Sequence, residues 1–315
     1  MNADLQTVRV TRVVQETERI LSLELSQAGA GSLAGFDPGA HIDLHLPNGL
    51  VRSYSIMSAP ADLSRYRLGV LLDRQSRGGS SFIHQHLRVG AQIKVSKPRN
   101  NFPVVNTPRA VFIAGGIGIT PLLGMATQLA GEGCAVDMLY CARSEEEMAF
   151  RQELEGFPGK LMMHFDDRQG GAPDLIAFLR KYSPDTPVYC CGPSPMLKAL
   201  DTACSHLALQ NVHTERFAGV VTVPANDPGY EVVLSRSGRA LFHDGRGSLI
   251  DTLLAAGHPV SFSCREGVCG SCETVVLEGT PDHRDFVLSP GEREAGKTMM
   301  ICVSGCKSSR LVLDL

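Results

Sequence analysis

Four cysteines near the C-terminus constrain the fold of this chain more than any other feature. Cys264, Cys269 and Cys272 form the pattern C-x4-C-x2-C in the run CREGVCGSC, and Cys302 follows thirty residues later. This spacing is typical of a plant-type [2Fe-2S] site, in which four thiolates hold two irons. The two glycines between the cysteines give the loop the backbone freedom to wrap tightly. The pattern therefore predicts a centre that accepts and passes single electrons.

Two alternatives for these cysteines remain open. A structural zinc site usually pairs two C-x2-4-C clips, whereas this segment has one clip preceded by a longer gap, so the spacing favours the cluster. The segment ICVSGC also offers Cys306 as the fourth ligand. We expect Cys302, because it directly follows the apolar residues 299–301 and would stand at a fixed strand end.

The composition limits the class of protein. The chain has 315 residues, 43% hydrophobic and 20% charged, which suits an enzyme of two or three domains. A net charge of −3 gives no footprint for nucleic acid. The first residues hold no apolar signal core, and no stretch approaches roughly eighteen apolar residues, so no membrane partner is expected. Ten cysteines would suggest disulfides in a small secreted protein, but this chain is not small and has no signal core, so the predicted location is a reducing cytoplasm.

The first segment, residues 1–105, shows the pattern of short strands. Apolar and polar side chains alternate in HIDLHL (41–46) and again in the run around Leu68 and Val70. The turn signals Asp-Pro-Gly (37–39) and Pro-Asn-Gly (47–49) separate the runs. Many short strands without long helices predict an antiparallel β-barrel.

The second segment, residues 106–224, alternates strands with helices. A strand over 110–114 leads to a helix ending near residue 130, and a strand over 188–191 leads to a helix over 195–207. Between them we expect a helix over 145–154, with Ser144 as its N-cap. This alternation predicts an α/β domain with a parallel sheet.

The third segment, residues 230–315, follows a linker-like stretch at 223–229 that holds two prolines. Strands over 230–234 and 240–243 suggest a hairpin, and Ser248 suits the N-cap of a helix over 248–256. A last strand is expected over 311–315. One helix on a small mixed sheet is an α+β pattern.

The middle segment carries a dinucleotide-binding pattern. Gly115, Gly116 and Gly118 stand between a predicted strand and helix in GGIGITP, and Pro121 suits the first helical turn. Such glycines let backbone N–H groups approach a pyrophosphate. Ligands of open α/β sheets lie at the carboxyl ends of strands, so the turn CGPSPM (191–196) should frame the same cofactor. The further candidate residues are Cys191, Gly192, Pro193, Met196 and, after the second strand, Arg143.

The first segment carries a candidate flavin site. A nicotinamide delivers two electrons together and the cluster accepts one, so a flavin is expected between them as the converter. In RSYS, Arg52 can neutralise a phosphate, Tyr54 can stack on the flavin, and Ser53 and Ser55 add hydroxyl groups. Gly79, Ser80 and Ser81 precede an apolar helix start and form a second phosphate candidate.

All three segments, in this order, resemble the phthalate dioxygenase reductase family, which includes vanillate demethylase reductases. The resemblance covers essentially the whole chain. It rests on RSYS (52–55), RGGS (77–80), GGIGITP (115–121), CGPSPM (191–196), ERF (215–217), CREGVCGSC (264–272) and the MICVS segment with Cys302. The family implies a multi-domain fold: an antiparallel β-barrel flavin domain, an α/β parallel-sheet NADH domain and an α+β plant-type ferredoxin domain of the β-grasp type.

The resemblance also implies roles for single residues. The RSYS residues would contact FMN, with Ser55 at the ring N5, and the backbone of Val70 and Leu71 would edge the ring. Thr120 would reach flavin and nicotinamide together, Phe217 would pack over the flavin face, and Cys191 would lie beside the nicotinamide C4. NADH rather than NADPH follows from the resemblance, and FMN rather than FAD from the lack of a second adenine-holding motif in the barrel.

The activity implied by the resemblance is electron transfer. NADH would reduce FMN, and the cluster would pass electrons singly to a separate Rieske non-haem iron oxygenase acting on an aromatic or similar small substrate. A stand-alone flavin reductase and a non-catalytic redox sensor are the alternatives. The GGIGITP and RSYS segments argue against the sensor.

Overall fold

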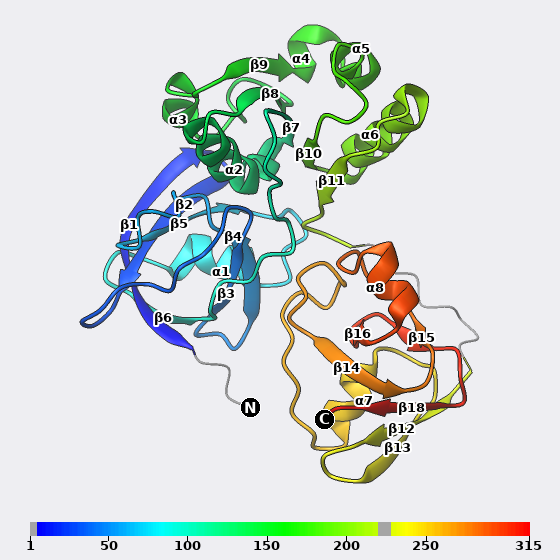
Figure 1. Cartoon of the computed structure of the whole chain (residues 1–315). Helices are drawn as coiled ribbons and strands as arrows, with labels where there is room; N and C mark the ends of the chain where they lie inside the picture. Colours follow the sequence, from blue (N-terminus) through cyan, green and yellow to red (C-terminus); the bar gives the residue numbers. More distant parts are fainter. Residues whose placement is uncertain (1–4, 220–227) are drawn as a thin grey trace. The chain divides into compact units, whose positions relative to one another are not determined.

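The structure is a computed structural model that describes residues 5–219 and 228–315 (Figure 1). The chain forms two compact units, Met1–Arg216 and Phe217–Leu315, which are described separately. Most of the expected linker at 223–229 lies outside the described residues, and the three predicted domain boundaries stay a prediction. None of the described helices has the length and apolar character that crossing a membrane requires.

The N-terminal half of the first unit is a six-stranded antiparallel sheet in the order β4-β3-β6-β1-β2-β5. One bridge, between Ile56 and Leu68, joins its two outer strands, so the sheet curls into a barrel with a seam between β4 and β5. Helix α1 packs against this barrel through the buried Ile83. The elements are β1 (Gln6–Thr17), β2 (Ile20–Gln27), β3 (His41–His45), β4 (Val51–Ser55), β5 (Tyr66–Leu71), α1 (Gly79–His86) and β6 (Gln92–Val95).

The second half of this unit is a five-stranded parallel sheet in the order β11-β10-β7-β8-β9. The chain runs outward from β7 in one direction and then returns to β10 on its other side, so the topology reverses between β7 and β10. The elements are β7 (Arg109–Gly115), η1 (Gly116–Gly118), α2 (Ile119–Gly131), β8 (Ala135–Ala142), α3 (Arg151–Glu155), β9 (Lys160–Phe165), α4 (Asp166–Gln169), α5 (Leu175–Leu179), β10 (Val188–Cys191), α6 (Ser194–Leu207) and β11 (Val212–Glu215).

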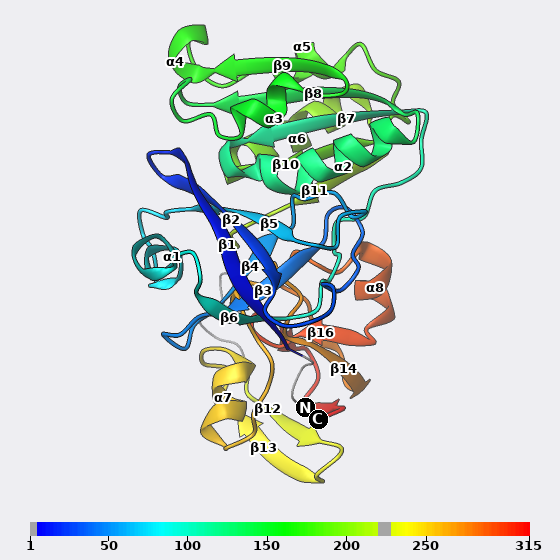
Figure 2. The same cartoon turned by 90° about the vertical axis from the view of Figure 1, so that its left-hand side faces the viewer.

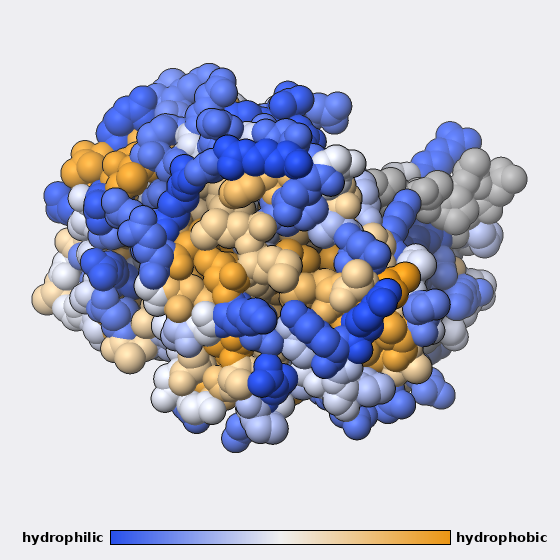
Figure 3. Space-filling view, turned by 90° about the horizontal axis from the view of Figure 1, so that it is seen from above, coloured by the Kyte–Doolittle hydropathy of each residue, from blue (hydrophilic) through white to orange (hydrophobic). Residues whose placement is uncertain are grey.

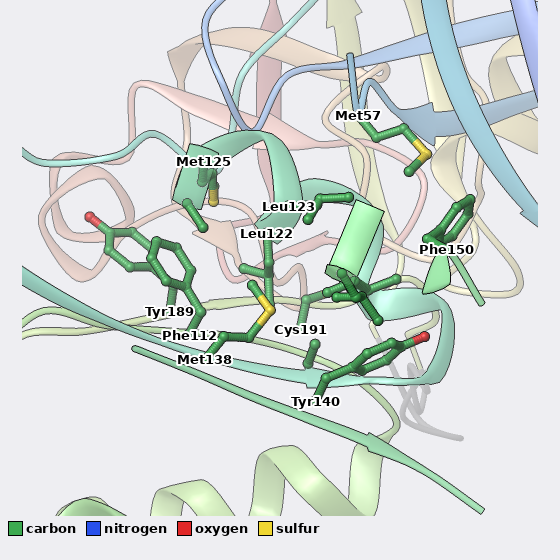
Figure 4. Close-up of a cluster of buried hydrophobic side chains, with 14 of the residues drawn as sticks. Met57, Phe112, Leu122, Leu123, Met125, Met138, Tyr140, Phe150, Tyr189 and Cys191 are labelled. Carbon is green, nitrogen blue, oxygen red and sulfur yellow. The ribbon is translucent and has the colours of Figure 1, made fainter. Parts of the chain in front are cut away.

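Helices cover both faces of this sheet (Figure 2). Along β7, Ala110, Phe112 and Ala114 join one core with α2, whereas Val111 and Ile113 join a second core with α5 and α6. The strand is therefore buried on both sides, as its continuous apolar run predicts. The first core also takes in Met57 beyond β4 and Ile20 of β2, so barrel and parallel sheet share buried surface within one unit (Figure 4).

The expected helix over 145–154 is wrong. Helix α3 begins only at Arg151, and residues 148–150 before it are buried and belong to no helix or strand. Phe150 has a φ of 60° and is 1% exposed. Burial of these apolar side chains in the α2 core outweighs local helix propensity, which is a weak preference.

The second unit has one mixed sheet in the order β13-β12-β18-β14-β16 and a short pair, β15 and β17. Helix α7 packs on it through Leu249, Ile250 and Leu253, with Ser248 as the predicted N-cap. This is the expected ferredoxin-like α+β architecture. The elements are β12 (Tyr230–Leu234), β13 (Arg239–His243), α7 (Leu249–Ala255), β14 (Glu273–Glu278), β15 (Pro281–Asp282), α8 (Pro290–Ala295), β16 (Thr298–Met300), β17 (Gly305–Cys306) and β18 (Arg310–Leu313).

Some large apolar side chains remain exposed in both units, among them Met162 and Met163 of β9 and Phe242 of β13. Apolar side chains also gather among hydrophilic ones on the face drawn in Figure 3. Exposed apolar residues are normal for folded proteins, and the fold itself rests on the buried clusters.

Candidate active site

The turn after β7, residues 115–121, is called the nucleotide turn here, and it lies at the point where the strand order reverses. A Cβ added at Gly118 would lie 2.1 Å from the carbonyl oxygen of Cys191, at the end of β10. The two turns predicted to frame one cofactor are therefore in contact. Only glycine allows this approach, and crevices of this kind hold dinucleotides in open α/β sheets.

Further close contacts lock the two turns together. Gly115 and Gly192 leave room for Met196, because an added Cβ would lie 2.8 Å and 2.7 Å from its sulfur, respectively. Gly115 also faces Pro193, whose Cδ would lie 2.7 Å from an added Cβ. Gly116 differs, since nothing would lie within 4 Å of its Cβ and its φ is 53°. This residue leaves an open space at the start of the helix where a phosphate or ribose can approach.

Cys191 is fully buried, and burial raises the pKa of its thiol well above the usual value, with a further contribution from Glu215. The two residues are register partners in β10 and β11. Part of Glu215 is accessible, but its Oε2 atom is buried without a hydrogen-bond partner, and this desolvation raises the pKa of the carboxyl to about 8. Sequence analysis quoted Glu215 only within ERF (215–217) and gave it no role of its own, because it predicted no strand ending there.

The phosphate candidates of the barrel meet at the N-terminus of α1. A Cβ added at Gly79 would lie 2.6 Å from Nε of Arg52, so the guanidinium group lies directly over the first helical turn. Ser80 and Ser81 both hydrogen-bond Ser76 through their hydroxyl groups, at 3.0 Å and 3.2 Å. A cation, hydroxyl groups and a helix N-terminus without acidic residues suit a phosphate monoester.

The other RSYS residues line the β4 side of the seam. Ser53 donates a hydrogen bond to Asp43 at 2.5 Å, and Arg99 pairs with the same carboxylate at 2.8 Å. Burial raises the pKa of Tyr54, against the opposing effect of Arg52, and Ser55 is buried. A neutral phenol and a buried hydroxyl suit an uncharged aromatic ring system better than a charged ligand.

Strand β5 forms the other side of the seam. The Val70 carbonyl oxygen lies 3.0 Å from His84 Nε2, a contact that the sequence did not predict, and Leu71 is half-buried next to it. A Cβ added at Gly69 would lie 2.6 Å from Cγ2 of Thr120. The β5 strand therefore touches the nucleotide turn at Thr120. The contact of Thr120 with both flavin and nicotinamide stays a prediction.

The cysteine loop, residues 264–272, brings thiols together in the second unit. The thiol of Cys264 contacts those of Cys269 and Cys302, and the Cys302 thiol also contacts that of Cys272. The Glu266 N–H group donates to Cys264 Sγ at 3.3 Å. The loop turns sharply at Arg265, Gly267 and Gly270, all of which have positive φ.

These contacts suit a cluster with two metals. The thiols meet pairwise, and backbone N–H groups point at sulfur, as [2Fe-2S] ligands require. Across 5–219 and 228–315, no three histidine, cysteine or carboxylate side chains form a site for a single metal ion. The Cys306 sulfur instead lies 3.1 Å from Ser308 Oγ and 3.8 Å from the Arg310 carbonyl oxygen.

For two further predicted residues, Arg143 and Phe217, the structure gives only the local setting. Arg143 is exposed after β8, and its carbonyl oxygen accepts a hydrogen bond from the Asp167 N–H group at 3.0 Å. Phe217 opens the second unit with an exposed side chain. Two residues later, the Gly219 N–H group donates to Glu266 of the cysteine loop at 3.3 Å. The flavin contact expected of Phe217 stays a prediction.

Comparisons with known proteins agree with this geometry. Residues 112–202 match the oxidoreductase NAD-binding domain family, and residues 233–307 match the 2Fe-2S iron-sulfur cluster binding domain family. Phenoxybenzoate dioxygenase subunit beta of Ectopseudomonas oleovorans is 44% identical over 98% of this chain and 97% of its own. The vanillate O-demethylase oxidoreductase of a Pseudomonas species is 40% identical over 94% of this chain and 95% of its own.

The solved structure of phthalate dioxygenase reductase, described as modular for electron transfer from pyridine nucleotides to [2Fe-2S], superposes with a TM-score of 0.73 and 34% identity. The match covers 99% of this chain and 98% of that one. The chain belongs to the phthalate dioxygenase reductase family. It is an NADH-dependent oxidoreductase whose relatives are reductases of oxygenase systems, and the predicted fold class and the cofactors NADH, FMN and a [2Fe-2S] cluster are confirmed.

Membership in this family also decides between the two metal alternatives, because the C-terminal match is to a cluster-binding domain rather than to a zinc domain. A further solved structure contains a similar fold within a longer chain. In an intact type IV self-sufficient cytochrome P450 monooxygenase, 41% of the chain matches 99% of this one, with a TM-score of 0.91 and 36% identity. This family of reductases therefore also occurs within longer oxygenase chains.

Proposed function

We propose that this phthalate dioxygenase reductase relative delivers electrons to a separate Rieske non-haem iron oxygenase that acts on an aromatic or similar small substrate. The observation that carries the proposal is full-length similarity to reductases of oxygenase systems, with phenoxybenzoate and vanillate in the names of two of them. The nucleotide turn and the cysteine loop, present in one chain, provide an entrance and an exit for electrons.

The nucleotide turn binds and orients NADH. The open amide region at Gly116 accepts the pyrophosphate of NADH, while Gly118 holds the turn against Cys191. The Cys191 thiol is fully buried behind the turn and stays neutral because of its raised pKa, so it supports the nicotinamide site as an uncharged group and adds no competing nucleophile. Thr120 holds its own hydroxyl in a 3.0 Å hydrogen bond to the Ile117 carbonyl oxygen, which fixes the side chain in place.

The barrel side holds FMN. Arg52, Ser80 and Ser81 bind the phosphate at the N-terminus of α1, and Tyr54, Ser55, Val70 and Leu71 line the seam for the ring. When bound, FMN would supply a ring that accepts one hydride, carrying two electrons, from NADH and releases those electrons one at a time. Ser55 offers a buried hydroxyl group near the position expected for N5, where it can hydrogen-bond the ring in either redox state.

The cysteine loop holds the cluster through Cys264, Cys269, Cys272 and Cys302. The Glu266 N–H group donates to Cys264 Sγ at 3.3 Å, and the Gly267 backbone hydrogen-bonds the Cys302 sulfur, so backbone dipoles point at two of the four sulfurs. Such N–H groups stabilise thiolate charge and raise the reduction potential of a cluster, so the loop conformation sets how readily electrons enter.

The test combines the holoenzyme with different acceptors under anaerobic conditions. NADH should bleach the flavin first and the cluster second, and Cys302→Ser should keep flavin reduction and ferricyanide reduction but lose cytochrome c reduction. Retention of cytochrome c reduction by that variant would contradict the assigned exit.

The partner is tested by adding a purified oxygenase. We expect the oxygenase component of a vanillate O-demethylase to be reduced at its Rieske centre faster than a stand-alone cytochrome P450. Faster reduction of the P450 would assign the reductase to haem partners, and reduction of neither with full activity toward free flavin would favour the stand-alone flavin reductase.

A further inference from the structure

A partly buried network of ion pairs connects the barrel with the α/β half of the first unit. Arg67 of β5 pairs with Glu16 of β1 at 3.1 Å and, through its other terminal nitrogen, with Glu153 of α3. The three side chains are only 21%, 12% and 24% exposed. Glu16 also accepts a 2.6 Å hydrogen bond from Ser22. Arg67 therefore pairs with one carboxylate from the barrel, Glu16, and one from the α/β half of the unit, Glu153. Solvent screens ion pairs in such partly buried networks less than it screens surface pairs.

The same arginine lies over a strained aromatic residue. The Arg67 guanidinium carbon is 5.5 Å from the centroid of the Phe150 ring, a cation–π contact. Phe150 has φ of 60° and ψ of 38°, which is unfavourable for a bulky side chain, and it is 1% exposed. Figure 4 shows it in the buried cluster that also holds Cys191 and Met57. Strain of this kind persists where the surroundings fix the conformation, and it concentrates at functional sites.

Gly69, which lies two residues after Arg67 in β5, comes close to both Phe150 and Thr120. A Cβ added there would lie 2.9 Å from Cζ of Phe150 and 2.6 Å from Cγ2 of Thr120. One strand of the barrel therefore touches both the start of α3 and the start of α2. The next residues of β5 are Val70 and Leu71, and Thr120 belongs to the nucleotide turn. We call the residues that make these contacts the joint: Glu16, Arg67, Gly69, Thr120, Phe150 and Glu153.

We propose that Arg67 is a positioning residue for electron entry: through Glu153 and Phe150 it fixes the distance between the flavin strand β5 and the nucleotide turn. The inference rests on the proposed assignment of NADH to the turn and FMN to the seam. Hydride transfer falls steeply with small displacements of the reacting groups, and a shift of about 1 Å can cost about 100-fold in rate. A joint next to the reaction partners is well placed to prevent that shift.

The matched pair of variants is Arg67→Gln and Arg65→Gln. Both remove one positive charge from the same edge of the barrel. Arg65 pairs with Asp62 at 3.2 Å and Glu24 at 3.6 Å, which both belong to the barrel, and its side chain is 50% exposed. A third variant, Glu153→Gln, removes the partner of Arg67 from the side of the parallel sheet and leaves the barrel intact.

Stopped-flow mixing of each FMN-loaded variant with NADH measures the limiting rate of flavin bleaching separately from NADH affinity. We expect Arg67→Gln and Glu153→Gln to lower the limiting rate at least tenfold with an NADH dissociation constant within about threefold of wild type, and Arg65→Gln to change neither more than twofold. Dithionite should reduce flavin and cluster fully in all variants.

A second readout needs no cofactor. In flavin-free protein, hydrogen–deuterium exchange at amides 117–120 and 151–155 should increase in Arg67→Gln and Glu153→Gln but not in Arg65→Gln. An unchanged limiting rate in Arg67→Gln and Glu153→Gln, with lower melting temperatures alone, would reduce the joint to a stabilising contact and overturn the proposal. If Arg67→Gln fails to fold, Glu153→Gln decides. Failure of wild-type protein to bleach its flavin with NADH would instead overturn the proposed function.

Discussion

The nucleotide turn and the cysteine loop are both rich in glycine, but glycine meets a different need in each. Gly118 has ordinary helical angles, with φ of −62°, and lacks space, because an added Cβ would meet a carbonyl oxygen at 2.1 Å. Gly270 has φ of 73°, a conformation that L side chains avoid. The nucleotide turn needs glycine because a side chain has no space there, and the cysteine loop needs it because the backbone has a positive φ. A glycine-to-alanine substitution should therefore damage the two sites in different ways.

The largest effect should come from the loop's sulfurs. Cys302→Ser removes one of four thiols that contact one another, so iron content should fall from about two atoms per chain to well below one. Cys306→Ser is the matched control, because that sulfur lies against Ser308 and Arg310. Iron analysis and the visible spectrum measure both variants. Loss of iron from Cys306→Ser and retention in Cys302→Ser would exchange the two ligand assignments.

The next effect tests missing volume in the nucleotide turn. Gly118→Ala forces a methyl group against the Cys191 backbone, which should destabilise the first unit by ~1–3 kcal/mol and slow flavin bleaching by NADH about 100-fold. Gly131→Ala, at the far end of the same helix, should change neither, since nothing would lie within 4 Å of the added atom. Thermal unfolding and stopped-flow rates give the answer, and equal behaviour of the two variants would remove the close-contact explanation.

A smaller effect tests backbone direction in the cysteine loop. Gly270→Ala imposes a left-handed conformation on a residue with a side chain, at a cost of about 1–2 kcal/mol. The cluster should still assemble, but its absorbance should be lost at a lower temperature than in wild type. Gly291→Ala in α8 serves as control, because nothing would lie within 4 Å of its Cβ. A Gly270→Ala protein that keeps its cluster to the same temperature would argue against the dihedral requirement.

The smallest effect concerns pH and Glu215. Its folded pKa is about 8, above the usual 4.5, so the folded protein keeps a proton that the unfolded chain releases between these values. Stability from this group is therefore full below about pH 4.5, decreases as pH rises toward about 8, and is constant above. Glu215→Gln removes this dependence. Because part of Glu215 is accessible, solvent screens much of this effect, so the melting temperature of the variant relative to wild type should rise by only a few degrees from pH 5 to pH 8. A flat difference would contradict the raised pKa.

The sequence predicted the chemistry better than the connections between elements. The cysteine spacing and the Ser248 N-cap depend only on residues close together in the sequence, so they can be predicted without knowing the tertiary contacts. Helix α8 was missed although Ser289 and Glu292 form a capping box with Pro290 between them, which is a readable pattern. By contrast, Arg67 and Glu153 are 86 residues apart, and no periodicity indicates that they pair. The strained Phe150 was hidden in the same way, because only its tertiary neighbours explain it.

The burial of Cys191 has a consequence for the durability of the enzyme. A carrier of low-potential electrons works in contact with dissolved oxygen, and leakage to oxygen yields peroxide, which attacks thiolates far faster than thiols. With no exposed surface and a thiol that keeps its proton, Cys191 has little thiolate to lose. The packing that holds the nucleotide turn in place thus also protects the Cys191 sulfur from oxidation by peroxide over repeated turnover.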